Sequence, residues 1–255
     1  MGKISLEIEN SIAIMRINRP EALNALSRQI VDEMDKFIED VASNQNVKAL
    51  IIYSEGNFAA GADIGGMVDC DEKSAQEFSF TPTFNKISAL KIPTIAAIEG
   101  YALGGGMELA LACDMRIAAD NAKMGFPEIT LGIMPGAGGT VRAPKLIGVA
   151  RAKEMIFMGG SITAQKAEAI GLVNLVVPKE EVFNSAMKWA EKIARLSSAA
   201  LKVAKETIDQ AYMQTDVLKG VEIEASNWAK MFNTEDQKEG MKAFLEKRKP
   251  CFQGK

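Results

Sequence analysis

The stretch from Gly100 to Thr140 reads GYALGGGMELALACDMRIAADNAKMGFPEITLGIMPGAGGT, and it decides the fold that the sequence predicts. An apolar run, Ile92 to Ile98, precedes it, so the pattern predicts a buried strand, a turn and a helix from about Met107 to Cys113. Glycines 104–106 open this helix, and glycines there let another group approach the backbone closely. Free N–H groups at a helix start favour a negative oxygen.

The same stretch holds two carboxylates twenty positions apart. Glu108 falls in the first turn of the predicted helix, and Glu128 follows Pro127, beyond a predicted strand around Met115 to Ala118. Each acid alone also fits a structural role, because a first-turn glutamate complements the helix dipole and Glu128 fits a surface position. A second glycine cluster follows, made of Gly136, Gly138 and Gly139.

Composition narrows the classes of function. The 255 residues suit one large α/β domain or a domain with a smaller appendage, and the net charge of −3 argues against nucleic-acid binding as the main task. No apolar run reaches about 18 residues, so no transmembrane helix is expected. Cys70, Cys113 and Cys251 are widely spaced, which disfavours a disulfide framework or a zinc site and favours the reducing cytoplasm.

The chain contains no histidine. Ser-His-Asp and Cys-His catalysis within the chain are therefore excluded, and so are His-ligated metal sites. Acid–base chemistry near neutral pH must use carboxylates, Tyr, Lys or Cys whose pKa values are shifted by their surroundings.

Local patterns predict the elements before the central stretch. Alternating apolar residues at Ile4 to Glu9 and Ile12 to Ile17 predict a hairpin with Asn10 and Ser11 at its turn. Ser27 is expected to cap a helix that runs to about Ala42, and Val47 to Tyr53 is expected to be a buried strand. Residues 71–90 are expected to be helical in part, with a break at residues 81–83.

The chain after Thr140 is predicted to be mostly helical. We expect a helix over 149–158, a second helix capped by Thr163 and closed by Gly171, and a strand over 172–177. Further helices are expected over 178–196, 198–213, 217–232 and 235–248. Strands that alternate with helices before residue 180 predict an α/β fold. No glycine-rich phosphate-binding motif of the kinase or dinucleotide type is present.

Five motifs in order resemble the crotonase (enoyl-CoA hydratase/isomerase) superfamily over essentially the whole chain. They are Asn18-Arg19-Pro20-Glu21-Ala22-Leu23-Asn24-Ala25-Leu26, Phe58-Ala59-Ala60-Gly61-Ala62-Asp63-Ile64, Gly100-Tyr101-Ala102-Leu103-Gly104-Gly105-Gly106-Met107-Glu108-Leu109, Pro127-Glu128 and Pro135-Gly136-Ala137-Gly138-Gly139-Thr140. The resemblance implies an α/β spiral of repeated ββα units over residues 1–197, with a C-terminal helical oligomerisation region over residues 198–255. It also implies a homotrimer or a homohexamer built as a dimer of trimers.

The resemblance further implies a site for acyl-CoA thioesters. The backbone N–H groups of Ala62 and Gly105 match an oxyanion hole, Glu108 and Glu128 match the catalytic acids, and the N–H of Gly136 matches a group that holds water. The positions that match CoA contacts are Ala22, Ala60, Asp63, Ile64, Phe244 and Lys247. Many members carry a lysine after the Ala-Asp-Ile run, where this chain has Gly65 and Gly66, so the resemblance leaves one contact to the CoA nucleotide open.

Two glutamates at these positions imply an enoyl-CoA hydratase, which adds water reversibly and syn to a 2-enoyl-CoA through an oxyanion-stabilised thioester enolate. CoA thioester is then the substrate, and no separate cofactor, metal, nucleic acid or membrane partner is expected. The alternatives are a specialised hydratase/dehydratase or isomerase of the same family, for example acting on a cyclic dienoyl-CoA, and a non-catalytic acyl-CoA-binding paralogue. Acyl chain length, pathway and the division of labour between Glu108 and Glu128 stay open.

Overall fold

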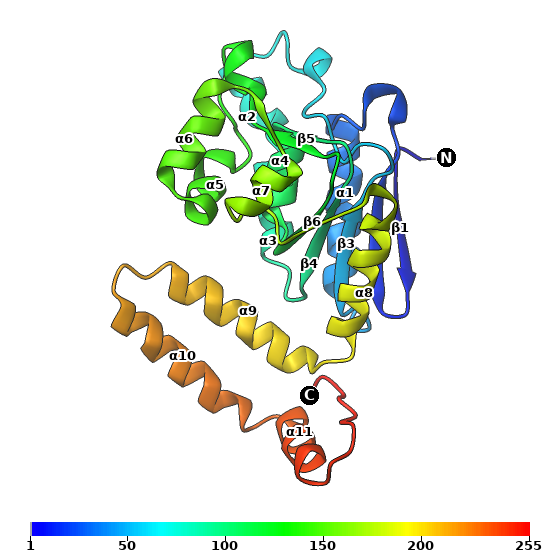
Figure 1. Ribbon diagram of the computed structural model, residues 1–255, viewed down its shortest axis with the longest axis vertical. Helices are drawn as coiled ribbons and strands as arrows, with labels where there is room; N and C mark the ends of the chain where they lie inside the picture. Colours follow the sequence, from blue (N-terminus) through cyan, green and yellow to red (C-terminus); the bar gives the residue numbers. More distant parts are fainter. Residues whose placement is uncertain (1) are drawn as a thin grey trace.

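A computed structural model describes residues 2–255 as a six-stranded sheet and a three-stranded sheet with helices around them and a helical extension (Figure 1). The larger sheet has the strand order β1-β2-β3-β4-β6-β9; β1 and β2 pair antiparallel and the other neighbours pair parallel. The smaller sheet has the order β5-β7-β8. The strands are β1 Ile4–Glu9, β2 Ile12–Ile17, β3 Ala49–Tyr53, β4 Thr94–Ile98, β5 Tyr101–Leu103, β6 Met115–Ala119, β7 Lys123–Gly125, β8 Ser161–Thr163 and β9 Leu175–Val177.

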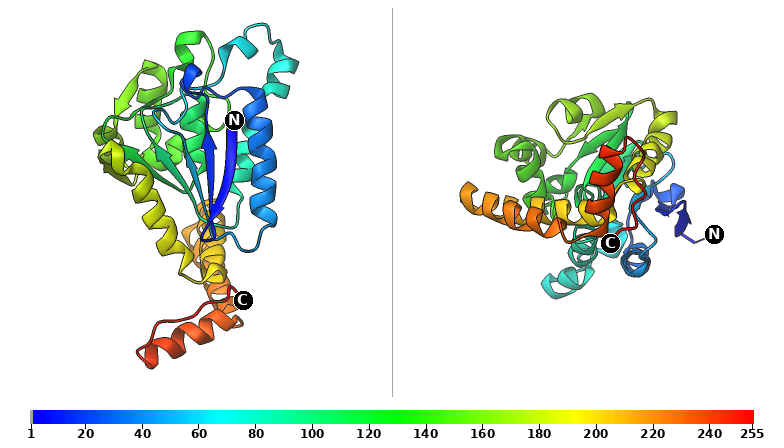
Figure 2. Two further views of the ribbon diagram at one scale, coloured as in Figure 1. Left: turned by 90° about the vertical axis from the view of Figure 1, so that its right-hand side faces the viewer. Right: turned by 90° about the horizontal axis from the view of Figure 1, so that it is seen from below.

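Helices cover both faces of the larger sheet. Figure 2 shows α1, in blue, and α8, in yellow, on opposite sides of it. Strands β3 and β4 are buried along their whole length, which is why they read as unbroken apolar runs. The helices before residue 197 are α1 Arg28–Ser43, α2 Glu72–Phe78, α3 Thr81–Ser88, α4 Gly105–Ala112, α5 Gly139–Ile147, α6 Val149–Met158, α7 Ala164–Ala169 and α8 Val182–Ala194, with the short 3-10 helices η1 Pro20–Ala22, η2 Ile64–Gly66, η3 Pro127–Leu131 and η4 Lys179–Glu181.

The two sheets are built from one repeated unit. β4 lies in the larger sheet, β5 follows it in the smaller sheet, and α4 comes next; β6 and β7 divide between the sheets in the same way. An isolated bridge between Ala59 and Ala102 places the segment after β3 beside β5, as a further partial strand. The spiral of ββα units implied by the resemblance is therefore confirmed.

Three helices extend away from the sheets at the C-terminal end (Figures 1 and 2). They are α9 Ser198–Tyr212, α10 Val217–Met231 and α11 Glu235–Leu245. Ser197, Asp216 and Thr234 cap their N-termini with side-chain hydrogen bonds. No residue of α9 is buried, and the buried residue of α10 is Gly220, so α9 and α10 form no apolar core between them; in α11, Asp236 and Ala243 are buried.

Several local predictions are confirmed and others are wrong. The hairpin turn at Asn10 and Ser11 and the Ser27 cap are present. The predicted break in the helical region is present but lies at Ser79 and Phe80, between α2 and α3; residues 81–83 form the first turn of α3, where the missing N–H of Pro82 costs no hydrogen bond. Helix α4 begins at Gly105, two residues earlier than predicted, because the glycines themselves are helical. The three-residue strands β5, β7 and β8 were not predicted.

The first turn of α4 packs directly on the segment after β3. A Cβ atom at Gly106 would collide with the carbonyl oxygen of Ala59, whereas a Cβ at Gly105 would lie 3.6 Å from its nearest neighbours, an ordinary contact. Leu103 N–H donates to that same Ala59 oxygen over 3.0 Å, so the carbonyl is held in place and cannot turn away.

Gly106→Ala is therefore expected to lower the free energy of unfolding by at least about 2 kcal/mol, because overpacking against fixed backbone outweighs the gain of about 1 kcal/mol in helix propensity. Gly105→Ala is the matched control and should change stability by less than about 1 kcal/mol. Urea denaturation at one protein concentration measures both variants. Equal stability of the two would contradict the packing described.

Candidate active site

Two backbone N–H groups without intramolecular acceptors lie side by side at the start of α4. Gly105 is the first residue of α4, so its N–H has no helical acceptor. The N–H of Leu26 donates to Gly61 O and the N–H of Asp63 donates to Leu26 O, both over 2.8 Å. The N–H of Ala62, between these two contacts, takes no part in them. The Cβ position of Gly105 is 3.6 Å from Ala62 N. Within residues 2–255 neither N–H donates a hydrogen bond, so the two groups form a pair of available donors.

Backbone contacts fix the segment that carries Ala62. Phe58 N donates to Glu99 O over 2.7 Å, and Ala59 N donates to Tyr101 O over 2.9 Å. Gly61 has a φ of 116°, a conformation that side chains rarely adopt, and it turns the chain so that Ala62 follows beside α4. The small residues of this motif are thus required by its geometry.

Glu108 lies in the first turn of α4 and is buried. Its Oε1 accepts hydrogen bonds from Ala137 N over 2.7 Å and Gly139 N over 2.8 Å. Burial raises the pKa of this carboxyl, and the two N–H groups and the Arg142 guanidinium act in the opposite direction by favouring the carboxylate. Both donors bind Oε1, which leaves Oε2 to other partners.

Glu128 lies in the first turn of η3 and is 9% exposed. Its Oε1 is 2.8 Å from the Cβ position of Gly104, and its Oε2 is buried without a hydrogen-bond partner. Burial raises the pKa of this carboxyl to about 7, its own backbone N–H opposes the rise, and the charge of Glu108 adds to it. Near neutral pH Glu128 therefore divides between its protonated and ionised forms.

The structure brings four predicted residues together: Ala62, Gly105, Glu108 and Glu128. Phe80, which the sequence did not single out, forms an apolar wall beside them, with its ring 3.6 Å from the Cβ position of Gly105. Gly136 lies in the loop next to Ala137 and is exposed; its carbonyl accepts the Thr81 hydroxyl over 2.9 Å. Ala137 and Gly139, which flank Gly138 and donate to Glu108, were not predicted as its donors, although both lie in the motif Pro135-Gly136-Ala137-Gly138-Gly139-Thr140.

The predicted CoA contacts divide into two groups. Ala22, in η1, and Ala60 lie together, because Ala60 N donates to Leu23 O over 3.1 Å. Asp63 accepts from Arg19 over 2.7 Å and from Gly65 N over 3.2 Å, and the Arg19 bond holds its pKa below the usual value. Ile64 is 46% exposed at the start of η2. These residues form one strip that leads to Ala62.

Phe244 and Lys247 lie elsewhere. Phe244, near the end of α11, is 82% exposed, and Lys247 follows it with a φ of 53°. Helix α11 is at the opposite end of the molecule from α4 and α2 (Figure 1). A single chain therefore does not bring these two residues to the other site residues.

Two further searches covered the described part of the chain. No group of three or more Cys, Asp or Glu side chains in residues 2–255 is arranged to hold a metal ion. None of the helices described combines the length and apolar character needed to cross a membrane. Cys70, Cys113 and Cys251 are free thiols.

Comparison with known proteins gives one consistent result. The chain is 42% identical over 253 residues to the short-chain-enoyl-CoA hydratase of Clostridium acetobutylicum and 44% identical over 253 residues to the crotonyl-CoA hydratase of Syntrophomonas wolfei; each alignment covers 98% of this chain and 97% of the relative. The crystal structure of an enoyl-CoA hydratase from Bacillus anthracis superposes with a TM-score of 0.95 at 39% identity, covering 100% of both chains.

A second solved structure and a family model also match the chain. A second solved structure, an enoyl-CoA hydratase subunit from Geobacillus kaustophilus, has a TM-score of 0.95 at 42% identity and covers 100% of this chain and 99% of its own. The family model described as enoyl-CoA hydratase/isomerase matches residues 7–255. The chain belongs to the enoyl-CoA hydratase/isomerase family, as its motifs and its fold predicted.

Proposed function

We propose that this chain is an enoyl-CoA hydratase that adds water reversibly across the 2,3 double bond of a 2-enoyl-CoA thioester and forms a 3-hydroxyacyl-CoA. One observation carries the proposal: two buried glutamates from different elements, Glu108 and Glu128, meet beside two backbone N–H groups without acceptors. The relatives named for short-chain and crotonyl substrates favour a short acyl chain.

The N–H groups of Ala62 and Gly105 would bind the thioester oxygen. When water adds at C3, the thioester becomes an enolate and this oxygen gains negative charge. Donors that are already fixed in place stabilise such charge without reorganising, and each is worth about 3–4 kcal/mol in other enzymes. The hydrogen bonds on both sides of Ala62 keep its N–H in position before substrate arrives.

The two carboxyls would divide the proton transfers. Glu108 accepts two N–H bonds at Oε1, which favour its ionised form, so its Oε2 can accept a proton from the attacking water. Glu128 has a pKa of about 7 and no partner at Oε2, so its protonated form can donate to C2. The N–H of Gly136, on the exposed part of the loop, would help to hold the water.

CoA would lie along the strip formed by Ala22, Ala60, Asp63 and Ile64. In this arrangement the Asp63 carboxylate accepts a hydrogen bond from Arg19, which fixes the position of the strip. The exposed side chain of Ile64 offers apolar surface to the ligand. Phe244 and Lys247 would contact the CoA of another subunit, since their own chain keeps them distant from α4. The free thiols fit a reducing compartment such as the cytoplasm.

The helical region over residues 198–255 would assemble the oligomer, and residues 1–197 would form the catalytic core. Large apolar side chains stay exposed on α9–α11 and the loops between them: Ile208, Tyr212, Met213, Val217, Leu218, Val221, Trp228, Met241, Phe244 and Leu245. A cavity of about 750 Å³ also lies between α9 and the core. Apolar surface of this extent marks an interface between proteins.

Glu108→Gln and Glu128→Gln should each lower kcat by about 10²- to 10⁴-fold, because each removes a proton carrier. KM should change far less, since glutamine preserves size and the backbone donors stay. The double variant should be little worse than the weaker single one, because both acids act on one water. The assay follows loss of conjugated thioester absorbance with a panel of 2-enoyl-CoA substrates. Near wild-type turnover in either single variant would rule out this mechanism.

The pH dependence of kcat/KM should report the same pair. Hydration needs Glu128 protonated, so kcat/KM should fall about tenfold per pH unit above a pH of about 7. It needs Glu108 ionised, so kcat/KM should also fall on the acid side. Glu128→Gln should lose the alkaline limb. A wild-type profile that stays flat to about pH 9 would contradict the role given to Glu128.

The wild-type protein should be a trimer or a dimer of trimers. Trp228→Asp, on α10, should weaken assembly, because a 65% exposed tryptophan that contacts a partner would be replaced by a charge. Light scattering with activity measured on the same fractions tests this. A well-behaved monomer with full activity would contradict it.

A further inference from the structure

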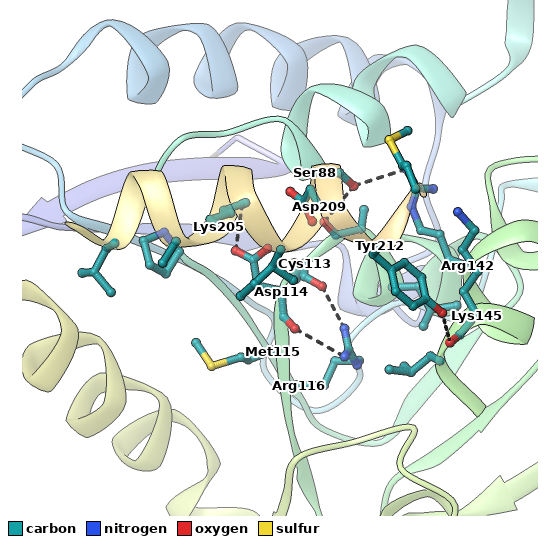
Figure 3. Close-up of a pocket in the computed structure, with 18 residues that line it drawn as sticks. Ser88, Cys113, Asp114, Met115, Arg116, Arg142, Lys145, Lys205, Asp209 and Tyr212 are labelled. Atoms are coloured by element: carbon teal, nitrogen blue, oxygen red, sulfur yellow. Dashed lines mark hydrogen bonds and ion pairs between the residues drawn. The ribbon is translucent and has the colours of Figure 1, made fainter. Parts of the chain in front are cut away.

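The side chain of Arg142, on α5, hydrogen-bonds to the loop before α5 and to α3. Its Nη1 donates to Ala137 O over 3.0 Å, and its Nη2 donates to Asn85 Oδ1 over 2.8 Å and to Ser88 Oγ over 3.2 Å. Arg142 lies in α5, and both acceptors of Nη2 lie in α3. Figure 3 shows Arg142 and Ser88 near one end of α9, among the residues that line the cavity beside this helix. The guanidinium therefore ties the loop before α5 to α3.

Arg142 and Glu108 bind the same residue, Ala137, through its two adjacent peptide groups. Ala137 gives its carbonyl to Arg142 Nη1 and its N–H to Glu108 Oε1. The backbone N–H of Arg142 also donates to Gly138 O over 2.7 Å. Gly138 has a φ of 112°, and a Cβ atom at this position would collide with the guanidinium of Arg142. The loop is thus folded around the arginine.

Ser88 closes this set of bonds into a ring. Its Oγ has two acceptors in reach, Ala112 O in the last residue of α4 over 3.0 Å and Phe84 O in its own helix over 3.3 Å, and the shorter distance favours Ala112. A path of hydrogen bonds therefore runs from Glu108 through Ala137, Arg142 and Ser88 and returns to the helix that carries Glu108. This path ties the donors of Glu108 to the helix that carries it.

We infer that Arg142 is a positioning residue: it holds the Ala137 and Gly139 N–H groups in the place where they orient the Glu108 carboxylate. The inference rests on the proposed hydratase function, in which Glu108 Oε2 receives a proton from water. A displacement of about 1 Å in such a site can lower the rate about 10²-fold, although the chemical groups are still present.

Charge supports the same assignment. Arg142 is the cation that favours the ionised form of Glu108, and Glu128, on η3, is the other charged group that faces it. Lys86, the cation of α3, is turned away and pairs with Asp35 and Glu39. Removing Arg142 should therefore raise the pKa of Glu108 further, so activity on the acid side should begin at a higher pH.

Arg142→Met is expected to lower kcat about 10- to 100-fold, with KM changed less than about threefold, and to move the acid limb of the pH profile upward. Arg142→Lys should keep the acid limb but recover only part of kcat, because one ammonium cannot reach the acceptors on both sides. The matched control is Lys145→Met, one turn along α5, whose Nζ lies over the Tyr212 ring. It removes the same charge from the same cavity and should leave kcat and the profile unchanged.

A second variant keeps the test decisive if Arg142→Met does not fold. Asn85→Ala with Ser88→Ala removes the acceptors of Nη2 and retains the charge, so it should lower kcat about tenfold without moving the acid limb. Wild-type kcat in either the Arg142→Met protein or this double variant would overturn the inference, as would an equal loss in Lys145→Met. An inactive wild-type protein would instead reject the proposed function.

Discussion

The site depends on how closely the first turn of α4 approaches the segment after β3. Gly106 leaves no space for a side chain against the Ala59 carbonyl, and this contact places the free N–H of Gly105 next to that of Ala62. Glu108 follows within the same turn and is carried into the interior, since every residue of α4 is buried. A single backbone contact therefore sets the position of the donor pair and of one carboxyl together.

The two glutamates differ in what surrounds them. Both are buried, and burial raises both pKa values, but two backbone N–H groups bind Glu108 Oε1 whereas Glu128 Oε2 has no donor. Hydrogen bonds to a carboxylate favour its ionised form, so the donors separate the proton affinities of two identical side chains. An environment that separates two carboxyls in this way is the usual basis for assigning one as base and the other as acid.

Features set by residues that are close together in the sequence were predictable from it. The hairpin at Asn10 and Ser11, the Ser27 cap and the C-terminal helices follow from local periodicity and capping. The strands β5, β7 and β8 have three residues each, too few to show an alternating pattern, and Pro82 fits a helix start as well as a break. Arg142 acts through Asn85, 57 positions away, and through backbone atoms, so nothing in its own segment indicated its contacts.

The absence of histidine makes this packing more important than it would otherwise be. An unperturbed carboxyl has a pKa of about 4 and is a poor proton donor near neutral pH. Burial moves Glu128 into the useful range, and that burial exists because Gly104 leaves room for its carboxyl 2.8 Å from where a Cβ atom would be. The glycines at the start of α4 thus have two effects: Gly106 brings the N–H of Gly105 beside that of Ala62, and Gly104, the residue before the helix, leaves room for the Glu128 carboxyl. A side chain at Gly106 would disturb the first effect and a side chain at Gly104 the second, which is why the glycine run and the two glutamates have to be understood as one site.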